Sequence, residues 1–281
     1  MASARLAAGF RPLRVEVSGS VVTGAEAGAG PALVLLHGLG GTWEYWRRTM
    51  ELLRGRARCI ALDLPGFGHS DAPPGGFDLD SAADELAGAM RALGTGAASV
   101  CGHSLGGPLA VRLALRHPGA VARVILVGPS GLEPAPAWQN LVLKLVPVYR
   151  ALRRAPFRWE HWLLRIAPLR RAALRALVDD PASVDDDTAR SLVDGGREAR
   201  ELQGAIAASF AVGLAEEAAR LTVPVAAIWG ERDRMVPPGD AATLQQHVPS
   251  AIVRFLPGAG HLPMVERPEA FAALLAQVAE L

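Results

Sequence analysis

The chain has 281 residues, half of which are hydrophobic, and a formal net charge of +1. This length fits one large α/β domain or two small ones and supplies enough apolar side chains for a sizeable core. Because the charge is nearly balanced, we expect no nucleic-acid partner. No apolar run approaches the roughly 20 residues of a membrane span, so we expect no stable membrane insertion.

Two further features concern the cellular compartment. Cys59 and Cys101 both lie in apolar, strand-like runs; they have the character of buried small hydrophobes and do not indicate a disulfide or a metal site. Residues 1–10 contain only a brief Ala/Leu stretch, which is too short for the core of a secretory signal. We therefore expect a cytoplasmic protein.

Apolar runs that predict strands alternate along the chain with amphipathic stretches that predict helices. Residues 13–17 and 20–22 alternate apolar and polar side chains, as in a half-exposed edge hairpin. The later runs are typical of strands buried in a parallel sheet. The alternation predicts an α/β fold with a mostly parallel, eight-stranded sheet flanked by helices. The further strands are predicted at 32–36, 58–62, 97–100, 124–127, 224–229 and 252–256, and the helices from near 42 and at 79–93, 105–117, 239–246 and 268–281.

Strand signals are absent between residues 132 and 221. This segment has helical periodicity interrupted by prolines, and we interpret it as a helical cap inserted between two strands. Its charge is divided, because residues 144–175 are strongly basic and residues 179–217 are mostly acidic. We favour two solvated helix faces that attract one another. The alternative is an Arg-rich amphipathic surface that contacts membranes or acidic ligands.

The most informative motif is Gly102-His103-Ser104-Leu105-Gly106, which lies between a predicted strand and a predicted helix. A tight turn there holds Ser104 at strained backbone angles, and glycine two residues before and after it avoids side-chain clashes. The strain exposes the Ser104 hydroxyl at the N-terminal end of the helix, where unpaired N–H groups favour negative charge. An incidental serine in a Gly-rich turn is the alternative interpretation.

Two residues elsewhere in the chain are candidate partners of Ser104. Ligands in open α/β sheets collect at the carboxyl ends of the strands, and Asp233 and His261 each follow a predicted strand. A serine hydroxyl becomes a good nucleophile when an imidazole accepts its proton and a carboxylate orients that imidazole. We therefore predict Ser104 as nucleophile, His261 as base and Asp233 as acid, with Asp63 as the alternative acid.

Other polar residues near these motifs have structural interpretations. His37 is expected to support the Gly-rich loop that it opens, and His103 to point away from Ser104 into packing. His69 and Ser70 are expected to stabilise a turn. No cluster has zinc-ligand spacing, and we expect neither a metal nor an organic cofactor.

These motifs resemble those of the α/β-hydrolase superfamily, in particular its capped serine hydrolases of the carboxylesterase and lipase kind. The order Ser104, Asp233, His261 is the nucleophile–acid–base order of that superfamily. The resemblance implies a hydrolase core over residues 1–131 and 222–281, with the cap at 132–221. It also implies an oxyanion hole formed by the backbone N–H groups of Leu39 and Leu105. The matching stretches are 37–40, 63–70, 102–106, 230–233 and 260–261.

The resemblance also narrows the reaction. A serine at residue 104 separates the chain from the dehalogenase and epoxide-hydrolase branches, which have aspartate there, and implies acyl transfer to water through an acyl-serine. Because the expected pocket walls are apolar, we predict a hydrolase of small to medium apolar carboxylic esters, either a monomer or a homodimer. The expected pocket residues are Gly38, Leu39, Trp43, Trp138, Phe157, Trp162, Met235, Val236, Leu262 and Met264.

Several other functions are compatible with the same residues. A carbon–carbon bond hydrolase of the meta-cleavage type, a thioesterase and a perhydrolase all use similar triads. The meta-cleavage branch typically has tryptophan directly after the histidine, whereas this chain has Leu262, which weakens that alternative. Some proteins that resemble the family are signalling receptors that bind a ligand and recruit a partner, and a pocket that only binds a reactive intermediate is a further possibility.

Overall fold

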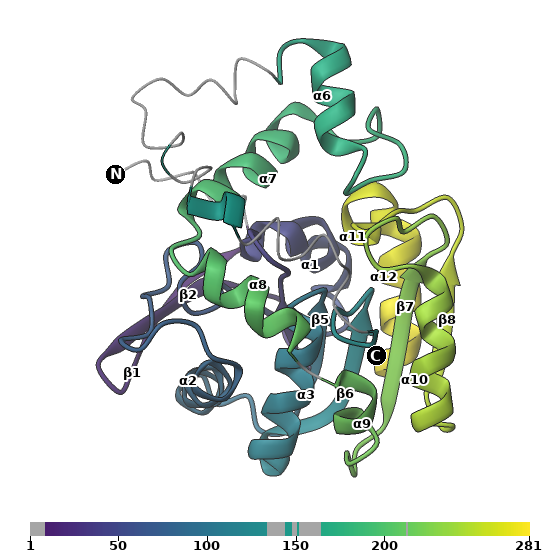
Figure 1. Cartoon of the computed structure of the whole chain (residues 1–281). Helices are drawn as coiled ribbons and strands as arrows, with labels where there is room; N and C mark the ends of the chain where they lie inside the picture. Colours follow the sequence, from purple (N-terminus) through teal and green to yellow (C-terminus); the bar gives the residue numbers. More distant parts are fainter. Residues whose placement is uncertain (1–8, 134–143, 148–150, 152–163, 212) are drawn as a thin grey trace.

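The computed structural model describes residues 9–133, 144–147, 151, 164–211 and 213–281 and is built around an eight-stranded sheet (Figure 1). The strand order is β1-β2-β4-β3-β5-β6-β7-β8. β2 pairs antiparallel with β1 and β4, and all other neighbours pair parallel. The predicted α/β class and mostly parallel sheet are confirmed. The strands are β1 (Arg11–Val17), β2 (Ser20–Ala27), β3 (Ala32–Leu36), β4 (Arg58–Leu62), β5 (Ala98–His103), β6 (Val121–Val127), β7 (Val225–Gly230) and β8 (Ile252–Leu256).

The hairpin β1–β2 differs from the expected edge hairpin in one respect. Only β1 lies at the edge of the sheet, because the second half of β2 is buried against β4. Gly24 permits this pairing, since a Cβ there would lie 2.1 Å from the carbonyl oxygen of Ala61. The predicted strand 20–22 therefore extends to Ala27, beyond the part in which apolar and polar residues alternate.

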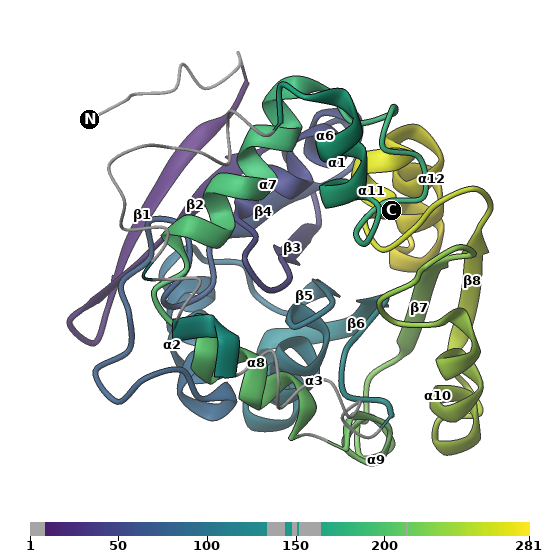
Figure 2. The same ribbon diagram turned by 45° about the horizontal axis from the view of Figure 1, so that its top comes forward.

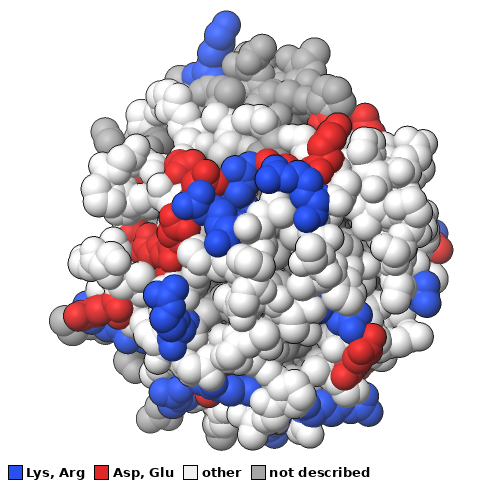
Figure 3. Space-filling view, turned by 90° about the horizontal axis from the view of Figure 1, so that it is seen from below, with Lys and Arg blue, Asp and Glu red and all other residues white. Residues whose placement is uncertain are grey.

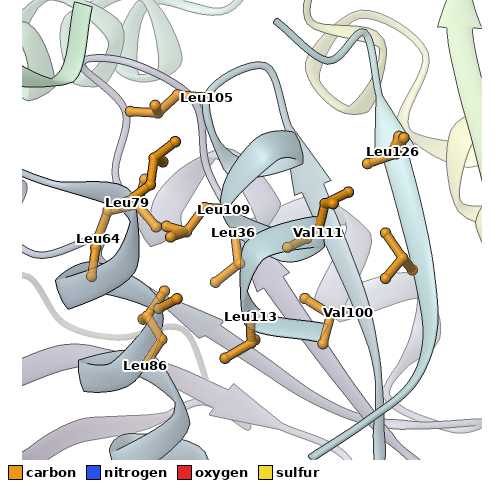
Figure 4. Packing of buried hydrophobic residues seen from close by; sticks show 14 of the residues in the cluster. Leu36, Leu64, Leu79, Leu86, Val100, Leu105, Leu109, Val111, Leu113 and Leu126 are labelled. Carbon is orange, nitrogen blue, oxygen red and sulfur yellow. The ribbon is translucent and has the colours of Figure 1, made fainter. Parts of the chain in front are cut away.

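Side chains of the central strands belong to two hydrophobic clusters, one on each face of the sheet. In β3, Val34 and Leu36 belong to the cluster that contains α2 (Leu79–Ala92) and α3 (Gly106–Arg116). Leu33 and Leu35 point to the opposite cluster, which contains α1 (Arg47–Leu53) and α12 (Pro268–Ala279). Figure 4 shows the α2 and α3 side of this packing. Each leucine that is fully buried in this way contributes roughly 1.5–3 kcal/mol, so both faces stabilise the sheet.

Local signals in the sequence fix where the helices of the two layers begin. α2 begins at the N-cap Asp78, whose carboxylate accepts hydrogen bonds from the N–H groups of Asp80 and Ser81, which stabilises the helix start. The closing helix predicted from residue 268 is α12. The other short helices are η1 (Trp43–Trp46), η2 (Pro118–Ala120), η3 (Pro238–Asp240), α10 (Ala241–His247) and α11 (Pro263–Glu266).

Between β6 and β7 the described residues form helices and no strand. Figures 1 and 2 place α6 (Ala167–Leu174), α7 (Asp186–Glu198) and α8 (Leu202–Phe210) beyond the carboxyl ends of the strands. α7 continues the cluster on the α1 side and α8 the cluster on the α2 and α3 side. The last helix, α9 (Leu214–Ala218), packs beside α3 and α10. The division into a core and a separate cap domain stays a prediction.

Surface charges of both signs lie close together. Arg170 of α6 pairs with Asp186 of α7, as the interpretation of two attracting helix faces predicts. Arg112 of α3 binds Asp80 of α2 and Glu217 of α9. On the face viewed in Figure 3, basic and acidic groups likewise lie next to one another. In the described part of the chain, no helix is long and apolar enough to cross a bilayer.

Candidate active site

Ser104 occupies the turn between β5 and α3 with a φ of +51°, a conformation that costs a non-glycine residue about 1–3 kcal/mol. The Ser104 N–H donates to the Val127 carbonyl at 3.0 Å, which holds the turn against β6. A Cβ at Gly102 would lie 2.0 Å from the Gly106 oxygen, and one at Gly106 would lie 2.5 Å from the Leu36 oxygen. Both glycines are therefore required for the strained turn that the sequence predicts.

Asp233 and His261 lie in the loops after β7 and β8 and are joined by a buried hydrogen bond. His261 Nδ1 donates to Asp233 Oδ2 at 2.7 Å, and the two side chains are 3% and 1% exposed. Asp233 Oδ1 accepts the N–H groups of Met235 at 2.8 Å and Val236 at 2.9 Å. With Nδ1 carrying the proton, Nε2 is left as the basic nitrogen of His261.

Ser104 and His261 line the same cavity, which has a volume of about 400 Å³. Of the predicted pocket residues, Leu39, Met235 and Leu262 line it. A larger set of aliphatic residues, all from the segment between β6 and β7, also lines the cavity and is not among the predicted pocket residues. These are Leu145, Val146, Leu177, Leu192, Leu202 and Ile206. The spacing of Leu202 and Ile206, four residues apart on α8, is the one signal that could have identified a shared helix face.

Other predicted pocket residues lie elsewhere. Trp43 lines a separate hollow beside Asp63 and α7. Its backbone N–H donates to Asp63 Oδ1 at 2.8 Å, and its ring lies beside Phe10. Val236 packs against the core, and its carbonyl accepts the Trp229 indole N–H. Met264 is fully buried, and Gly38 lies against Ser104, since a Cβ on it would come within 2.9 Å of the serine Cβ. Trp138, Phe157 and Trp162 lie outside the described residues.

The peptide N–H groups of Leu39 and Leu105 are oriented by the carbonyls that precede them. The Gly38 carbonyl accepts hydrogen bonds from His37 Nδ1 at 2.7 Å and from the Gly41 N–H at 3.0 Å. The Ser104 carbonyl accepts the Gly107 N–H at 2.9 Å. Because C=O and N–H point in opposite directions across a trans peptide, both N–H groups are turned away from these partners, and neither donates to another described residue.

Comparison with known proteins agrees with this geometry. Residues 31–268 match the family model for the alpha/beta hydrolase fold. The chain belongs to that family. It is 30% identical over 265 residues to a pimeloyl-[acyl-carrier protein] methyl ester esterase of Nitrosomonas europaea, covering 88% of this chain and 94% of that protein. It is 31% identical over 262 residues to a 2-hydroxymuconate semialdehyde hydrolase of a Pseudomonas species, covering 89% and 87%.

A solved structure with the same fold is that of a membrane phospholipase A described as a bacterial virulence factor. It matches 97% of this chain with a TM-score of 0.77 and 26% identity, and the match covers 86% of that protein. Family and relatives together support a hydrolase.

Two histidines of this hydrolase flank the candidate nucleophile without replacing His261. His37 is completely buried and accepts the Leu64 N–H at Nε2, at 3.0 Å. Burial lowers the pKa of His37, so it stays neutral and supports the Gly38 loop. The sequence predicts this structural role.

His103 is buried, as the sequence predicts, but it packs within the candidate site. It is among the residues that line the cavity, and its ring lies 4.6 Å from the His261 ring, between centroids. His103 Nε2 is 2.8 Å from the His261 carbonyl oxygen and donates to it, since that oxygen can only accept. Burial and the nearby His261 lower the pKa of His103 well below its usual value. A neutral His103 is thereby packed against the candidate base.

Asp63, the alternative acid, is fully occupied by other contacts. It accepts hydrogen bonds from the Thr23 hydroxyl at 2.7 Å, the Trp43 N–H at 2.8 Å and the His69 N–H at 3.2 Å. The Ser70 hydroxyl donates to the Asp63 carbonyl. Asp63 therefore organises a turn, and the carboxylate beside His261 is that of Asp233. Among the described residues, no group of three or more His, Cys, Asp or Glu could hold a metal ion.

Proposed function

We propose that this protein is a serine esterase that hydrolyses uncharged carboxylic esters with aliphatic acyl groups. One observation carries the proposal: Ser104 and the hydrogen-bonded pair Asp233–His261 lie beside the same aliphatic cavity, at one end of the sheet. The similarity to a protein named as a methyl ester esterase supports the same reaction class.

In this mechanism His261 Nε2 takes the proton of the Ser104 hydroxyl while the serine oxygen attacks the ester carbonyl carbon. The N–H groups of Leu39 and Leu105 receive the oxyanion, and preorganised donors of this kind are each worth roughly 3–4 kcal/mol. His261 then protonates the departing alcohol, and the same histidine activates the water that cleaves the acyl-serine. Asp233 holds the imidazole in place and stabilises its positive form throughout.

The cavity wall favours an uncharged acyl chain. Its described side chains from the segment between β6 and β7 are aliphatic, and no Lys or Arg is among the described residues that line it. The relative that hydrolyses 2-hydroxymuconate semialdehyde acts on a carboxylate, which a cation in the site would stabilise. Carbon–carbon bond hydrolysis is therefore the second candidate, favoured by that relative and opposed by this lining.

A series of p-nitrophenyl esters from acetate to dodecanoate tests the proposal. We expect kcat/KM to rise about fourfold with each methylene that the cavity buries and to level off when the cavity is full. Ser104→Ala should lose at least about 10⁴-fold in kcat. Ser99→Ala, on the same strand but remote from the cavity, is the matched control and should retain wild-type turnover.

Mass spectrometry after treatment with a fluorophosphonate provides an independent readout. Wild type and Ser99→Ala should gain one label, and Ser104→Ala none. Retained ester turnover by Ser104→Ala would exclude the mechanism. Absence of labelling in the wild type would favour a ligand-binding receptor, whereas faster cleavage of a meta-cleavage dienoate than of any ester would favour the carbon–carbon hydrolase.

A further inference from the structure

Residues 177–180, between α6 and α7, run across both loops that carry the candidate acid and base; we call this segment the strap. Its Asp179 carboxylate binds Arg232 at 2.7 Å and Arg234 at 3.0 Å, the two neighbours of Asp233 in the chain. The Asp179 side chain is only 10% exposed, whereas those of the two arginines are 64% and 50% exposed. The arginines therefore reach inward from the surface to Asp179.

The same strap also holds the loop that carries His261. The Leu262 N–H donates to the Leu177 carbonyl at 3.2 Å. The Glu266 carboxylate, which is buried, accepts both the Asp179 N–H at 2.9 Å and the Gly260 N–H at 2.8 Å. A Cβ at Gly260 would lie 2.7 Å from the Asp179 nitrogen, so the strap and the loop are in close contact directly before His261.

We propose that Asp179 is a positioning residue of the catalytic machinery. It holds the Asp233 loop directly and the His261 loop through the strap, so that the two loops keep fixed positions relative to each other. This inference rests on the proposed esterase function. Leu177 lines the cavity, so the strap also connects the wall that contacts the acyl chain with both loops.

The negative charge of Asp179 should also affect the charge balance around His261. Arg232 and Arg234 place two positive charges beside Asp233, and the Asp179 carboxylate offsets one of them. The hydrogen bond from Arg232 lowers the pKa of Asp179, which keeps the carboxylate charged. Without it, the greater net positive charge of this loop would oppose the positive charge that His261 acquires during turnover.

Asp179→Asn and Asp180→Asn form a matched pair, because Asp180 lies in the same strap but its carboxylate accepts only from the Ala182 N–H among the described residues. With the best p-nitrophenyl ester, Asp179→Asn should lower kcat about tenfold, with KM within about twofold, because misplaced catalytic groups slow chemistry without weakening substrate binding. An ion pair of this exposure contributes at most about 1 kcal/mol to stability, so Tm should change little. Asp180→Asn should resemble the wild type.

The pH dependence of kcat/KM separates positioning from a merely structural role. Among the described residues, the charged or titratable groups near His261 are Asp233 and His103. Those around Asp179 are Arg232, Arg234 and Glu266, with Glu231 acting on Arg232. Asp179→Asn should move the acid limb about 0.3 pH units lower, because it leaves more positive charge near His261. The double variant Arg232→Gln/Arg234→Gln also removes the ion pairs with Asp179. It should likewise lower kcat, but it should move the acid limb to higher pH because it removes positive charge.

Two outcomes would overturn the inference while leaving the esterase intact. One is wild-type kcat and acid limb in Asp179→Asn; the other is a change confined to KM, which would place the strap in substrate binding alone. A wild-type protein that neither cleaves an ester nor takes the fluorophosphonate label would instead refute the proposed function. If Asp179→Asn does not fold, the arginine double variant carries the same test of kcat.

Discussion

The two sides of the candidate site are built in different ways. The side that carries Ser104, Asp233 and His261 consists of loops at the ends of buried strands, held by backbone hydrogen bonds and by glycines that no other residue could replace. The facing side consists of aliphatic side chains of helices and of the strap, with no motif of their own. In the proposed esterase, catalysis and substrate selectivity therefore depend on different kinds of residue.

The difference follows from what each side must do. Proton transfer and oxyanion binding need atoms placed to within a fraction of an ångström, which only a closely constrained backbone supplies. Contact with an acyl chain needs apolar area and approximate shape, which many sequences supply. Substitutions on the first side should change the rate for every substrate, and those on the second should change which substrate is preferred.

The largest expected effect on kcat distinguishes two buried carboxylates, Asp233 and Asp63. Asp233→Asn should lower kcat about 10⁴-fold with all esters, because the amide would present the wrong tautomer of His261 to the serine. Asp63→Asn should mainly lower Tm, because Asp63 binds the Thr23 hydroxyl and the Trp43 N–H and not His261. Ester kinetics and thermal unfolding of both variants provide the comparison. A larger kinetic loss in Asp63→Asn would reverse the assignment of the acid.

A smaller loss is expected when the backbone support of the oxyanion site is removed. His37→Ala deletes the shorter of the two hydrogen bonds that hold the Gly38 carbonyl, so the Leu39 N–H is less firmly oriented. We expect kcat to fall about 10²-fold, the usual cost of one oxyanion donor, with little change in KM. His69→Ala is the control, since His69 contacts the same region through its backbone N–H. Equal kinetics of the two variants would mean that His37 has no part in this support.

These contrasts also explain how far the sequence could be interpreted. Gly102 and Gly106 predict the strained turn by their spacing around Ser104, although only the exclusion at Gly102 acts between close chain neighbours and the one at Gly106 comes from the distant Leu36 carbonyl. The strand that precedes Asp233 places it at the correct end of the sheet. The sequence predicts that His103 is packed but not against which group, because its partner is the carbonyl of His261, which lies far away in the sequence. Trp43 has the right hydrophobicity for a pocket wall, but its direction depends on Asp63, and Leu202 and Ile206 meet the cavity only through tertiary packing.

The helical side of the cavity can be tested by filling it. Ile206 lies on α8 and lines the cavity, whereas Ala207, its neighbour on the same helix, is exposed. Ile206→Trp should lower kcat/KM for the octanoate ester about tenfold while acetate hydrolysis stays within about twofold, because an overfilled wall costs about 1–3 kcal/mol only where the chain must enter. Ala207→Trp should leave the chain-length profile unchanged. A uniform loss with all esters would show that α8 also positions the catalytic groups.

The smallest effect concerns the stability of the core, far from the cavity. Burial, followed by the charge of Asp71, raises the pKa of Glu85 on α2 to about 7, and its Oε1 is buried without a hydrogen-bond partner in the described structure. A carboxyl whose folded pKa lies above its unfolded value stabilises the protein at pH values below the unfolded pKa, and that stabilisation is lost as the pH rises through about 7.

Glu85→Gln, which cannot ionise, should therefore raise Tm relative to wild type at pH 8, by an amount that corresponds to about 1 kcal/mol because Glu85 is only half-buried. At pH 5 the two proteins should unfold at similar temperatures, and at each pH the variant should hydrolyse esters at the wild-type rate. Glu51→Gln is the control and should show no such gain at pH 8, because Glu51 lies on the outer side of α1, where it pairs with the exposed Arg48. A Tm difference that is independent of pH would mean that Glu85 does not titrate between these values, and a parallel change in kcat would show that the core and the cavity are not separable.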